Sequence, residues 1–423
     1  MLRMWSLVKA SVLLVLLAAA TASPQSVTLR SPEEETRDYL SRLSPEQRAR
    51  SDAYFEGGYW LQLLDFLYGL GIALALLATG LSRRVRDLAL RVTRVRLLGT
   101  AIYAGFYILA SAVLSFPLAV YKGFFREHRY GLSNQTFGPW FQERLTALAV
   151  ALVILGLLLV LLYAIFRRAP KTWWIWGSVV SLSTLALTSL IAPVFIMPLF
   201  NDYRPLSVPE LRDSILAMAR ANGVPADEVY EFDASRQSKR ISANVSGILG
   251  TMRISLNDNL LSRCTPQEIH SVMGHEMGHY VLNHVYEGLL FFGVLLLVGF
   301  AFLRWGYRAA QRRFGERWGI GGIDDEAGLP LLAAVLSVYF FLTTPLINTF
   351  VRANEAEADI FGLNATREPE GFADVALKLG EYRKLDPGPI EEWIFFDHPS
   401  GRTRIEMAMR WKAGQAPLQG HAP

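Results

Sequence analysis

Six long apolar segments constrain this 423-residue chain more than any other feature of its sequence. A membrane-spanning helix needs about 20 mostly apolar residues, and it satisfies its own backbone hydrogen bonds within the lipid. The expected spans are residues 59–81, 97–121, 145–166, 173–200, 286–303 and 329–350. Because 52% of the residues are hydrophobic and only 19% are charged, the chain is more apolar than one soluble core requires. We predict a mainly α-helical, multi-pass protein of the lipid bilayer.

The N-terminus has the features of a secretory signal. Arg3 and Lys9 precede a short apolar segment, and Ala20-Thr21-Ala22 has the small-x-small form of a cleavage site. We therefore predict that residues 1–22 are a signal peptide, with a retained signal anchor as the alternative.

A His-Glu-x-x-His motif lies in a polar segment between the fourth and fifth spans. On a helix, His275 and His279 lie about 6 Å apart along the axis and share one face, so both can bind one metal ion. Glu276 leans toward the same side, where it can take a proton from a zinc-bound water. The motif predicts a zinc metallopeptidase. The alternative is a chance match formed by two surface histidines and a solvated glutamate.

A catalytic zinc ion needs a third protein ligand. The single cysteine, Cys264, excludes a thiolate cluster, so the ligand has to be a histidine or a carboxylate. Glu355 is the best candidate, because it follows the last span on the same side of the membrane as the motif. Asp359 lies on the same helical face as Glu355, and its carboxylate can fix the orientation of a metal ligand without binding the metal itself. Helical facing alone leaves Glu357 open as an alternative ligand.

Basic residues cluster in the loops after the first, third and fifth spans. They are Arg83, Arg84, Arg86, Arg91, Arg94, Arg96, Arg167, Arg168, Lys171, Arg304, Arg308, Arg312, Arg313 and Arg317. Counting spans places these loops on one side of the membrane and the His-Glu-x-x-His motif on the other. The positive-inside rule assigns the basic side to the cytoplasm, which predicts an extracytoplasmic active site, at the cytoplasmic membrane if the protein is bacterial. Since the basic clusters lie at span ends, we expect no nucleic-acid partner.

Several stretches resemble the type I CAAX prenyl endopeptidases, which are integral-membrane zinc proteases. Besides the zinc motif with Asn283-His284 and Glu355-x-x-x-Asp359, the matching stretches are Glu127–Thr136, Pro193–Asn201, Asn244 with Arg253–Asp258, and His398-Pro399 with Arg402 to Glu406. The resemblance implies a ring of membrane helices around a large water-filled chamber. It also implies a mostly helical gluzincin-type protease domain with a small strand region.

The same resemblance implies the roles of individual residues. One Zn²⁺ per chain would be held by His275, His279 and Glu355, with Glu276 as the general base. Asn244 would hold the substrate backbone or the developing oxyanion, and His398 would donate to the tetrahedral intermediate. Asp359 would orient a histidine ligand, with Arg404 behind it.

The expected partner is a peptide or protein substrate, membrane-associated and with or without a lipid. We divide the chain into the signal segment 1–22, an N-terminal membrane domain 23–200, a zinc metallopeptidase domain 201–410 and a flexible tail 411–423. Two alternatives remain: a heat-shock-type quality-control protease of membrane proteins with the same site, and a catalytically silent, zinc-binding membrane scaffold. An intramembrane protease is disfavoured, because polar residues flank the motif.

Overall fold

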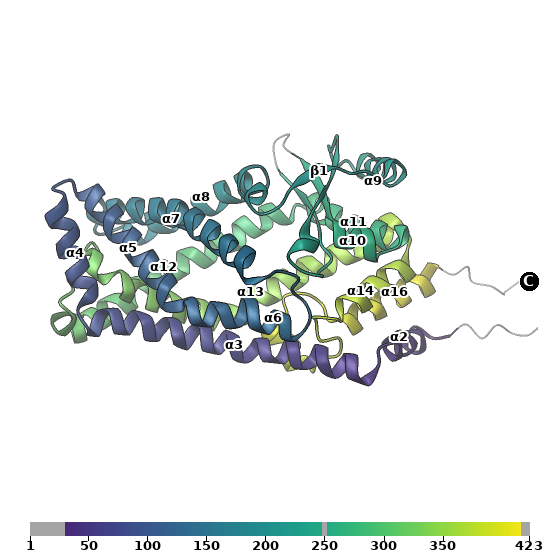
Figure 1. Cartoon of the computed structure of the whole chain (residues 1–423), viewed down its shortest axis with the longest axis horizontal. Coiled ribbons are helices and arrows are strands. Elements are labelled where there is room, and N and C mark those ends of the chain that lie inside the picture. Colours follow the sequence, from purple (N-terminus) through teal and green to yellow (C-terminus); the bar gives the residue numbers. More distant parts are fainter. Residues whose placement is uncertain (1–29, 248–251, 416–423) are drawn as a thin grey trace, which may run out of the picture.

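The computed structural model describes residues 30–247 and 252–415, so the predicted signal segment lies outside them, as does most of the predicted tail. Helices make up most of the described chain (Figure 1). The α-helices are α2 (Pro32–Ser41), α3 (Pro45–Ala78), α4 (Leu81–Val92), α5 (Arg96–Val120), α6 (Arg126–Arg129), α7 (Phe137–Arg168), α8 (Trp173–Ile191), α9 (Pro209–Ala221), α10 (Asp258–Arg263), α11 (Pro266–Val281), α12 (His284–Trp318), α13 (Leu329–Thr366), α14 (Pro369–Leu379), α15 (Pro389–Phe395) and α16 (Gly401–Gln415).

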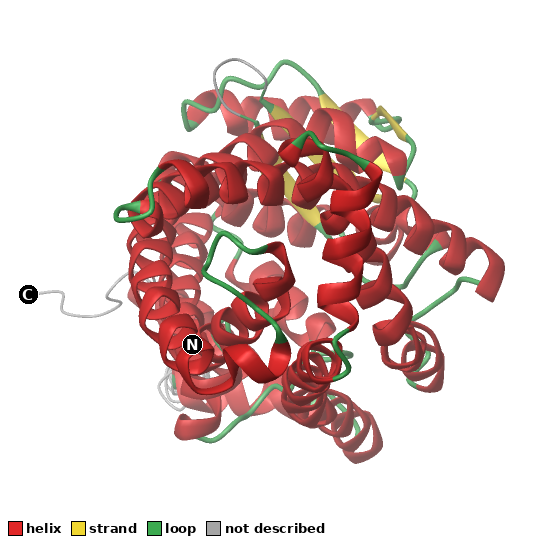
Figure 2. Ribbon diagram, turned by 90° about the vertical axis from the view of Figure 1, so that its left-hand side faces the viewer, coloured by secondary structure: helices red, strands yellow, loops and turns green. Residues whose placement is uncertain are grey.

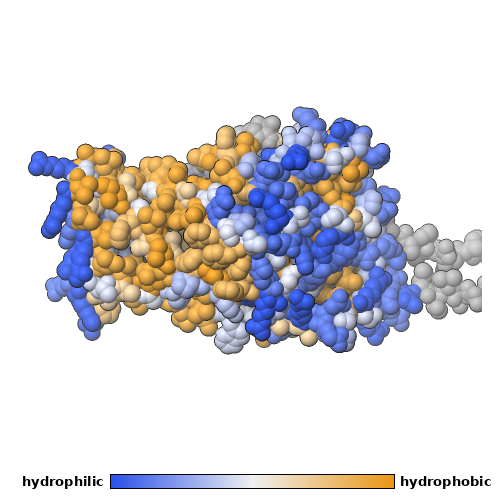
Figure 3. Space-filling model, viewed as in Figure 1, coloured by the Kyte–Doolittle hydropathy of each residue, from blue (hydrophilic) through white to orange (hydrophobic). Residues whose placement is uncertain are grey.

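Six of the described helical segments are long and apolar enough to cross a membrane, which confirms the predicted multi-pass fold. They are Pro45–Ala78, Arg96–Arg129, Phe137–Arg168, Trp173–Leu199, His284–Trp318 and Glu326–Thr366. Figure 3 shows the resulting apolar band, which is followed by a hydrophilic part that contains α9, α14 and α16. Several of these helices extend beyond the predicted apolar segments into polar sequence, α3 by more than a turn.

The spanning helices form a closed ring. Each of α3, α5, α7, α8, α12 and α13 packs against the next, and α13 packs against α3 (Figure 2). A cavity of about 550 Å³ lies between α3, α5, α6 and α7, and Lys122, Arg144 and Arg240 are among the residues that line it. Proline loosens two spans near their ends, since Pro117 precedes the π-helix η1 (Tyr121–Phe125) and Pro193 lies within the π-helix η2 (Ala192–Ile196).

Ion pairs join the loops at the arginine-rich end of the molecule. Arg86 of α4 contacts Asp325 at 2.7 Å, and Arg167 at the end of α7 contacts Glu326 at 2.9 Å. In Figure 1 this end, marked by α4, lies opposite the end that carries α9, α14 and α16. The loops between spans one and two, three and four, and five and six therefore share one end.

A four-stranded sheet lies beside the ring. Its strands are β1 (Tyr203–Pro205), β2 (Val229–Phe232), β3 (Ala243–Ser246) and β4 (Arg253–Asn257), in the order β1-β2-β4-β3. The pair β2–β4 is parallel and the other two pairs are antiparallel, which leaves β3 at an edge. Fully buried Ile215, Ile254, Leu256 and Met273 fill the core between the sheet, α9 and α11.

A separate apolar core joins the two ends of the described chain. Tyr39 and Leu40 of α2 pack with Leu363, Phe372 and Met409, which belong to α13, α14 and α16. Helix α2 begins with a capping box, in which the backbone N–H of Ser31 donates to Glu34 at 3.0 Å and the backbone N–H of Glu34 donates to Ser31 Oγ at 3.2 Å. The segment before the first span is thereby fixed to the helices that end the chain.

Candidate metal centre and active site

The sequence Thr265-Pro266-Gln267-Glu268 has a capping-box pattern that predicts the start of the motif helix, and α11 begins there. Thr265 caps it, and the Thr265 N–H donates to Glu268 Oε2 at 2.6 Å. The Lys378 ammonium on α14 also contacts Glu268 Oε2 at 2.6 Å. The beginning of α11 is therefore tied to α14, which forms one wall of the active-site cavity.

Glycines let α11 and α13 approach closely. A Cβ atom on Gly362 would lie 2.9 Å from the backbone nitrogen of His275, and one on Gly278 would lie 3.1 Å from Ala358 Cα. Real Cβ atoms essentially never come within 3.0 Å of another atom, and 3.1 Å is tighter than nine in ten real contacts, so both positions favour glycine. The close packing carries Glu355 on α13 up to the two histidines on α11.

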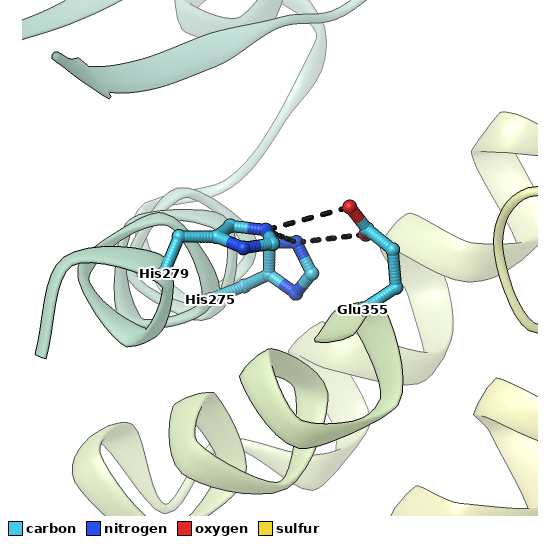
Figure 4. Close-up of side chains that lie close together, drawn as sticks. All are labelled: His275, His279 and Glu355. Atoms are coloured by element: carbon cyan, nitrogen blue, oxygen red, sulfur yellow. Dashed lines mark hydrogen bonds and ion pairs between the residues drawn. The ribbon is translucent and has the colours of Figure 1, made fainter. Parts of the chain in front are cut away.

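His275, His279 and Glu355 converge on one point (Figure 4), with one ligand atom from each lying within 4.8 Å of the others. The Nε2 atoms of the two histidines are 3.2 Å apart. Glu355 Oε2 lies 3.2 Å from His275 Nε2, and Glu355 Oε1 lies 3.4 Å from His279 Nε2. The two imidazoles come from α11 and the carboxylate comes from α13.

The chemistry of these donors fits a metal ion. Asp359 Oδ1 accepts from His275 Nδ1 at 2.7 Å, which leaves the Nε2 lone pair directed at the site. Glu355 Oε2 is buried and has no hydrogen-bond partner among residues 30–247 and 252–415, an arrangement that costs free energy unless a cation lies nearby. Two ring nitrogens and an unsatisfied carboxylate oxygen therefore form a ligand set for a divalent metal.

Asp359 and Arg404 form a buried pair behind His275. Asp359 is completely buried, and it accepts from Arg404 Nε at 2.8 Å. Burial by itself lowers the pKa of His275, but the Asp359 carboxylate outweighs this effect and raises that pKa to about 10. The surrounding carboxylates thus favour positive charge at this position, as a proton or as a metal.

His284 supports the second histidine, a contact that the sequence did not predict. Its Nδ1 lies 2.9 Å from His279 Nδ1, and its Nε2 lies 3.5 Å from Glu357 Oε2. The contact forms because α11 ends at Val281 and Asn283 adopts a left-handed conformation with φ of 62°. Glu357 itself contacts His284 and does not belong to the group of His275, His279 and Glu355.

Glu276 lies with His275 and Glu355 in a cavity of about 240 Å³. His398 and Arg404 also line it. The surrounding protein buries the Glu276 carboxyl and raises its pKa to about 7. The carboxyl can therefore both gain and lose a proton near neutral pH.

His398 and Asn244 occupy different places relative to this cavity. His398 Nε2 lies 3.3 Å from Glu355 Oε2, and its Nδ1 lies 2.8 Å from Asp397 Oδ1. Asn244 belongs to the edge strand β3, next to Ala243, which lines the cavity. The Asn244 side chain accepts a hydrogen bond from Ser246 Oγ at 3.1 Å, so it is directed along its own strand.

Other candidate side chains have ordinary structural contacts. His270 lies 2.8 Å from Ser214 Oγ, and both ring nitrogens of His128 lie 2.8 Å from backbone carbonyls. Burial raises the pKa of Cys264 to about 11, which makes its thiol unreactive. His421 lies outside the described residues.

Comparisons with known proteins agree with this fold and place the chain among metalloproteases. Residues 28–202 match the family model described as CAAX prenyl protease N-terminal, five membrane helices, and residues 205–412 match peptidase family M48. An uncharacterized metalloprotease of Bacillus subtilis is 30% identical over 381 residues, 88% of this chain and 87% of that protein. CAAX prenyl protease 1 of Saccharomyces cerevisiae is 32% identical over 322 residues, 72% of this chain and 70% of that protein.

The crystal structure of Ste24p from S. mikatae shares the fold. It superposes with a TM-score of 0.73 at 22% identity and covers 91% of this chain and 92% of its own. The described chain is thus a multi-pass membrane protein with a metalloprotease domain. It belongs to peptidase family M48, as a metalloprotease similar to the CAAX prenyl proteases.

Proposed function

We propose that this metalloprotease is a zinc endopeptidase in which His275, His279 and Glu355 hold the metal. One observation carries the proposal: the two imidazoles converge on the buried Glu355 carboxylate, whose Oε2 has no hydrogen-bond partner in the part of the chain that the structure describes. Two histidines and one glutamate, with a position left for water or substrate, are typical of catalytic zinc. When bound, zinc would polarise the scissile carbonyl and make a water more acidic.

Glu276 would act as the general base. Its carboxylate would accept a proton from the attacking water and then pass it to the leaving amine nitrogen. A pKa of about 7 suits both transfers. His398 would serve the developing oxyanion through Nε2, while Asp397, whose Oδ1 lies 2.8 Å from His398 Nδ1, would hold the ring in place. One such donor contributes about 2.7–4 kcal/mol.

We propose that the substrate binds as an added strand along β3. This strand is at the sheet edge, and the residues that lead into it line the cavity. An extended peptide can pair with an exposed edge through main-chain hydrogen bonds. The Asn244 amide would then exchange its contact with Ser246 for the substrate backbone or the oxyanion.

The proposed substrate is a membrane-associated peptide or protein segment, because the site lies on a ring of spanning helices. The relatives named CAAX prenyl proteases add a prenylated peptide to the candidates. We propose that the active site faces the extracytoplasmic side, since the basic loops lie at the opposite end of the spans. An unprenylated peptide is then the first substrate to test, beside its farnesylated form.

The test is to measure zinc content and peptide cleavage by the detergent-purified protein and by Glu276→Gln. We expect about one zinc per chain in both, with cleavage lowered by about 10²–10⁴-fold in the variant. Glu210→Gln, at an exposed position on α9, is the matched control and should cleave normally. Normal turnover by Glu276→Gln would exclude the base assignment. A zinc-loaded parent that cleaves no peptide would favour a silent scaffold.

A further inference from the structure

We infer that Arg383 binds a carboxylate of the substrate inside the active-site cavity. The inference rests on the proposed peptidase function and adds a group that the substrate has to present. Arg383 lies in the segment between α14 and α15, and it lines the same cavity as Glu276 and Glu355. It has no counterpart among the residues that the sequence predicted for the site.

The Arg383 side chain has no protein partner in the part of the chain that the structure describes. No carboxylate oxygen there lies within 4.0 Å of its guanidinium, and the guanidinium donates no hydrogen bond. Its backbone is fixed, because its carbonyl accepts from Ser51 Oγ at 3.0 Å and its N–H donates to the Leu379 carbonyl at 3.0 Å. Arg404, which lines the same cavity, is by contrast bonded to Asp359.

The surroundings leave the charge of Arg383 without a counter-ion. Burial lowers the pKa of its guanidinium, and the nearby positive charge of Arg404 lowers it further. Asp397 and Glu355 attract it from a distance, but Asp397 is bonded to His398 and Glu355 belongs to the metal centre. The Arg383 side chain is partly buried, and a guanidinium without a counter-ion can bind a carboxylate through two parallel N–H donors.

The cavity limits what can reach Arg383. Its volume is about 240 Å³, below the roughly 300–1,000 Å³ of sites for drug-sized ligands. One wall is apolar and is formed by Leu260, Phe372, Val375, Ala376 and Leu379. The space accepts a short segment with an apolar side chain, so the carboxylate lies near the scissile bond. That carboxylate can come from the substrate C-terminus or from an acidic side chain.

Three peptides of one parent sequence separate these sources: the free acid, the C-terminal amide, and the amide with one glutamate placed close to the scissile bond. The parent protein should cleave a carboxylate-bearing peptide with a kcat/KM about 10- to 100-fold above that of the neutral amide. Whichever peptide is preferred identifies the source. For that peptide, Arg383→Gln should lower kcat/KM to the value that the parent protein has for the neutral amide. For the neutral amide, kcat/KM of Arg383→Gln should stay within about twofold of the parent value.

Control variants distinguish binding from a structural role. Arg402→Gln removes an arginine that is paired with Asp386 at 2.7 Å outside the cavity, and it should keep the preference. Arg383→Lys keeps the positive charge but cannot donate two parallel hydrogen bonds to a carboxylate. It should therefore keep part of the preference for the carboxylate-bearing peptide. Equal losses for all three peptides in Arg383→Gln would overturn the inference, as would equal cleavage of all three by the parent.

A binding measurement separates this inference from the proposed function. In the Glu276→Gln background, the inhibition constant or thermal shift of short free-acid and glutamate-bearing peptides needs no turnover. Adding Arg383→Gln should weaken the favoured carboxylate peptide about tenfold or more and leave the amide unchanged. If Arg383→Gln has no effect on binding, the inference fails even where cleavage by the parent stands. If the parent cleaves nothing, this measurement still decides the role of Arg383.

Discussion

At the scale of single residues, Asp359 has two charged neighbours and no contact with solvent. It accepts from His275 Nδ1 and from Arg404. We predict that Asp359→Asn lowers zinc affinity about 10- to 100-fold, because it no longer fixes the tautomer and orientation of His275. It should also lower the free energy of unfolding by about 3–5 kcal/mol, since Arg404 loses its buried partner. Chelator competition and thermal melting measure the two effects.

Glu357→Gln is the matched control for this prediction. Glu357 lies on the same helix, but 62% of its side-chain surface is exposed, and its closest contact is His284 at 3.5 Å. Exposed pairs contribute little to stability, so zinc affinity should change by no more than about threefold. Equal losses in the two variants would mean that any charge change on this part of α13 disturbs the metal centre, and that Asp359 has no special role.

Sequence spacing accounts for some of these residue contacts and not for others. Four-residue spacing on one helix puts His275 and His279 on the same face, and it also pairs Glu355 with Asp359 on α13. The spacing could not select Glu355 over Glu357, because that choice depends on how α13 crosses α11. It also gave no role to His284 or Arg383, since one follows a helix end with a left-handed turn and the other lies in a connecting segment.

At the scale of elements, the proposed metal centre depends on the contact between α11 and α13. We predict that Gly362→Ala separates the two helices, because the added Cβ would lie 2.9 Å from the His275 backbone nitrogen. Glu355 would then move away from both histidines. Zinc affinity and peptide cleavage should fall at least tenfold, with a loss of about 1–3 kcal/mol in unfolding free energy from overpacking.

Gly288→Ala on α12 provides the comparison, because no heavy atom lies within 4 Å of its added Cβ. Alanine favours helix by about 1 kcal/mol over glycine, so this variant should keep its zinc and melt no lower than the parent. If Gly362→Ala keeps its zinc affinity, α11 and α13 can move apart without separating Glu355 from the two histidines, and the prediction is wrong.

Long helices could be predicted from the sequence, whereas short strands could be predicted less well. Six long apolar segments and the capping box before α11 identify helices directly. The alternating stretches Val229–Asp233 and Met252–Leu256 predict short strands, and β2 and β4 lie there. No such pattern predicts β1 or β3, which have only three and four residues. The edge position of β3 depends on pairing between distant segments. The predicted boundary between residues 200 and 201 stays a prediction.

At the scale of the whole molecule, the basic loops and the proposed active site lie at opposite ends of the spans. We predict that reporters fused after Arg94 and after Gly414 lie on opposite sides of the membrane, with Arg94 in the cytoplasm. Paired reporters, one active only in the cytoplasm and one only outside it, measure this. Location of both fusion points on the same side would contradict the six-span topology. If the reporters lie on opposite sides but Arg94 is outside the cytoplasm, only the predicted orientation is wrong.

The packing of α2 against α14 and α16 has a consequence for biogenesis. A ribosome delivers the two histidines of α11 well before Glu355, and Arg404 emerges later still. Helix α2, one of the first segments made, cannot complete its apolar core until α16 follows. Most of the spans are therefore synthesised before Glu355 and before the ion pair behind His275. In this order of synthesis, the proposed metal centre cannot be complete until the last span has been made.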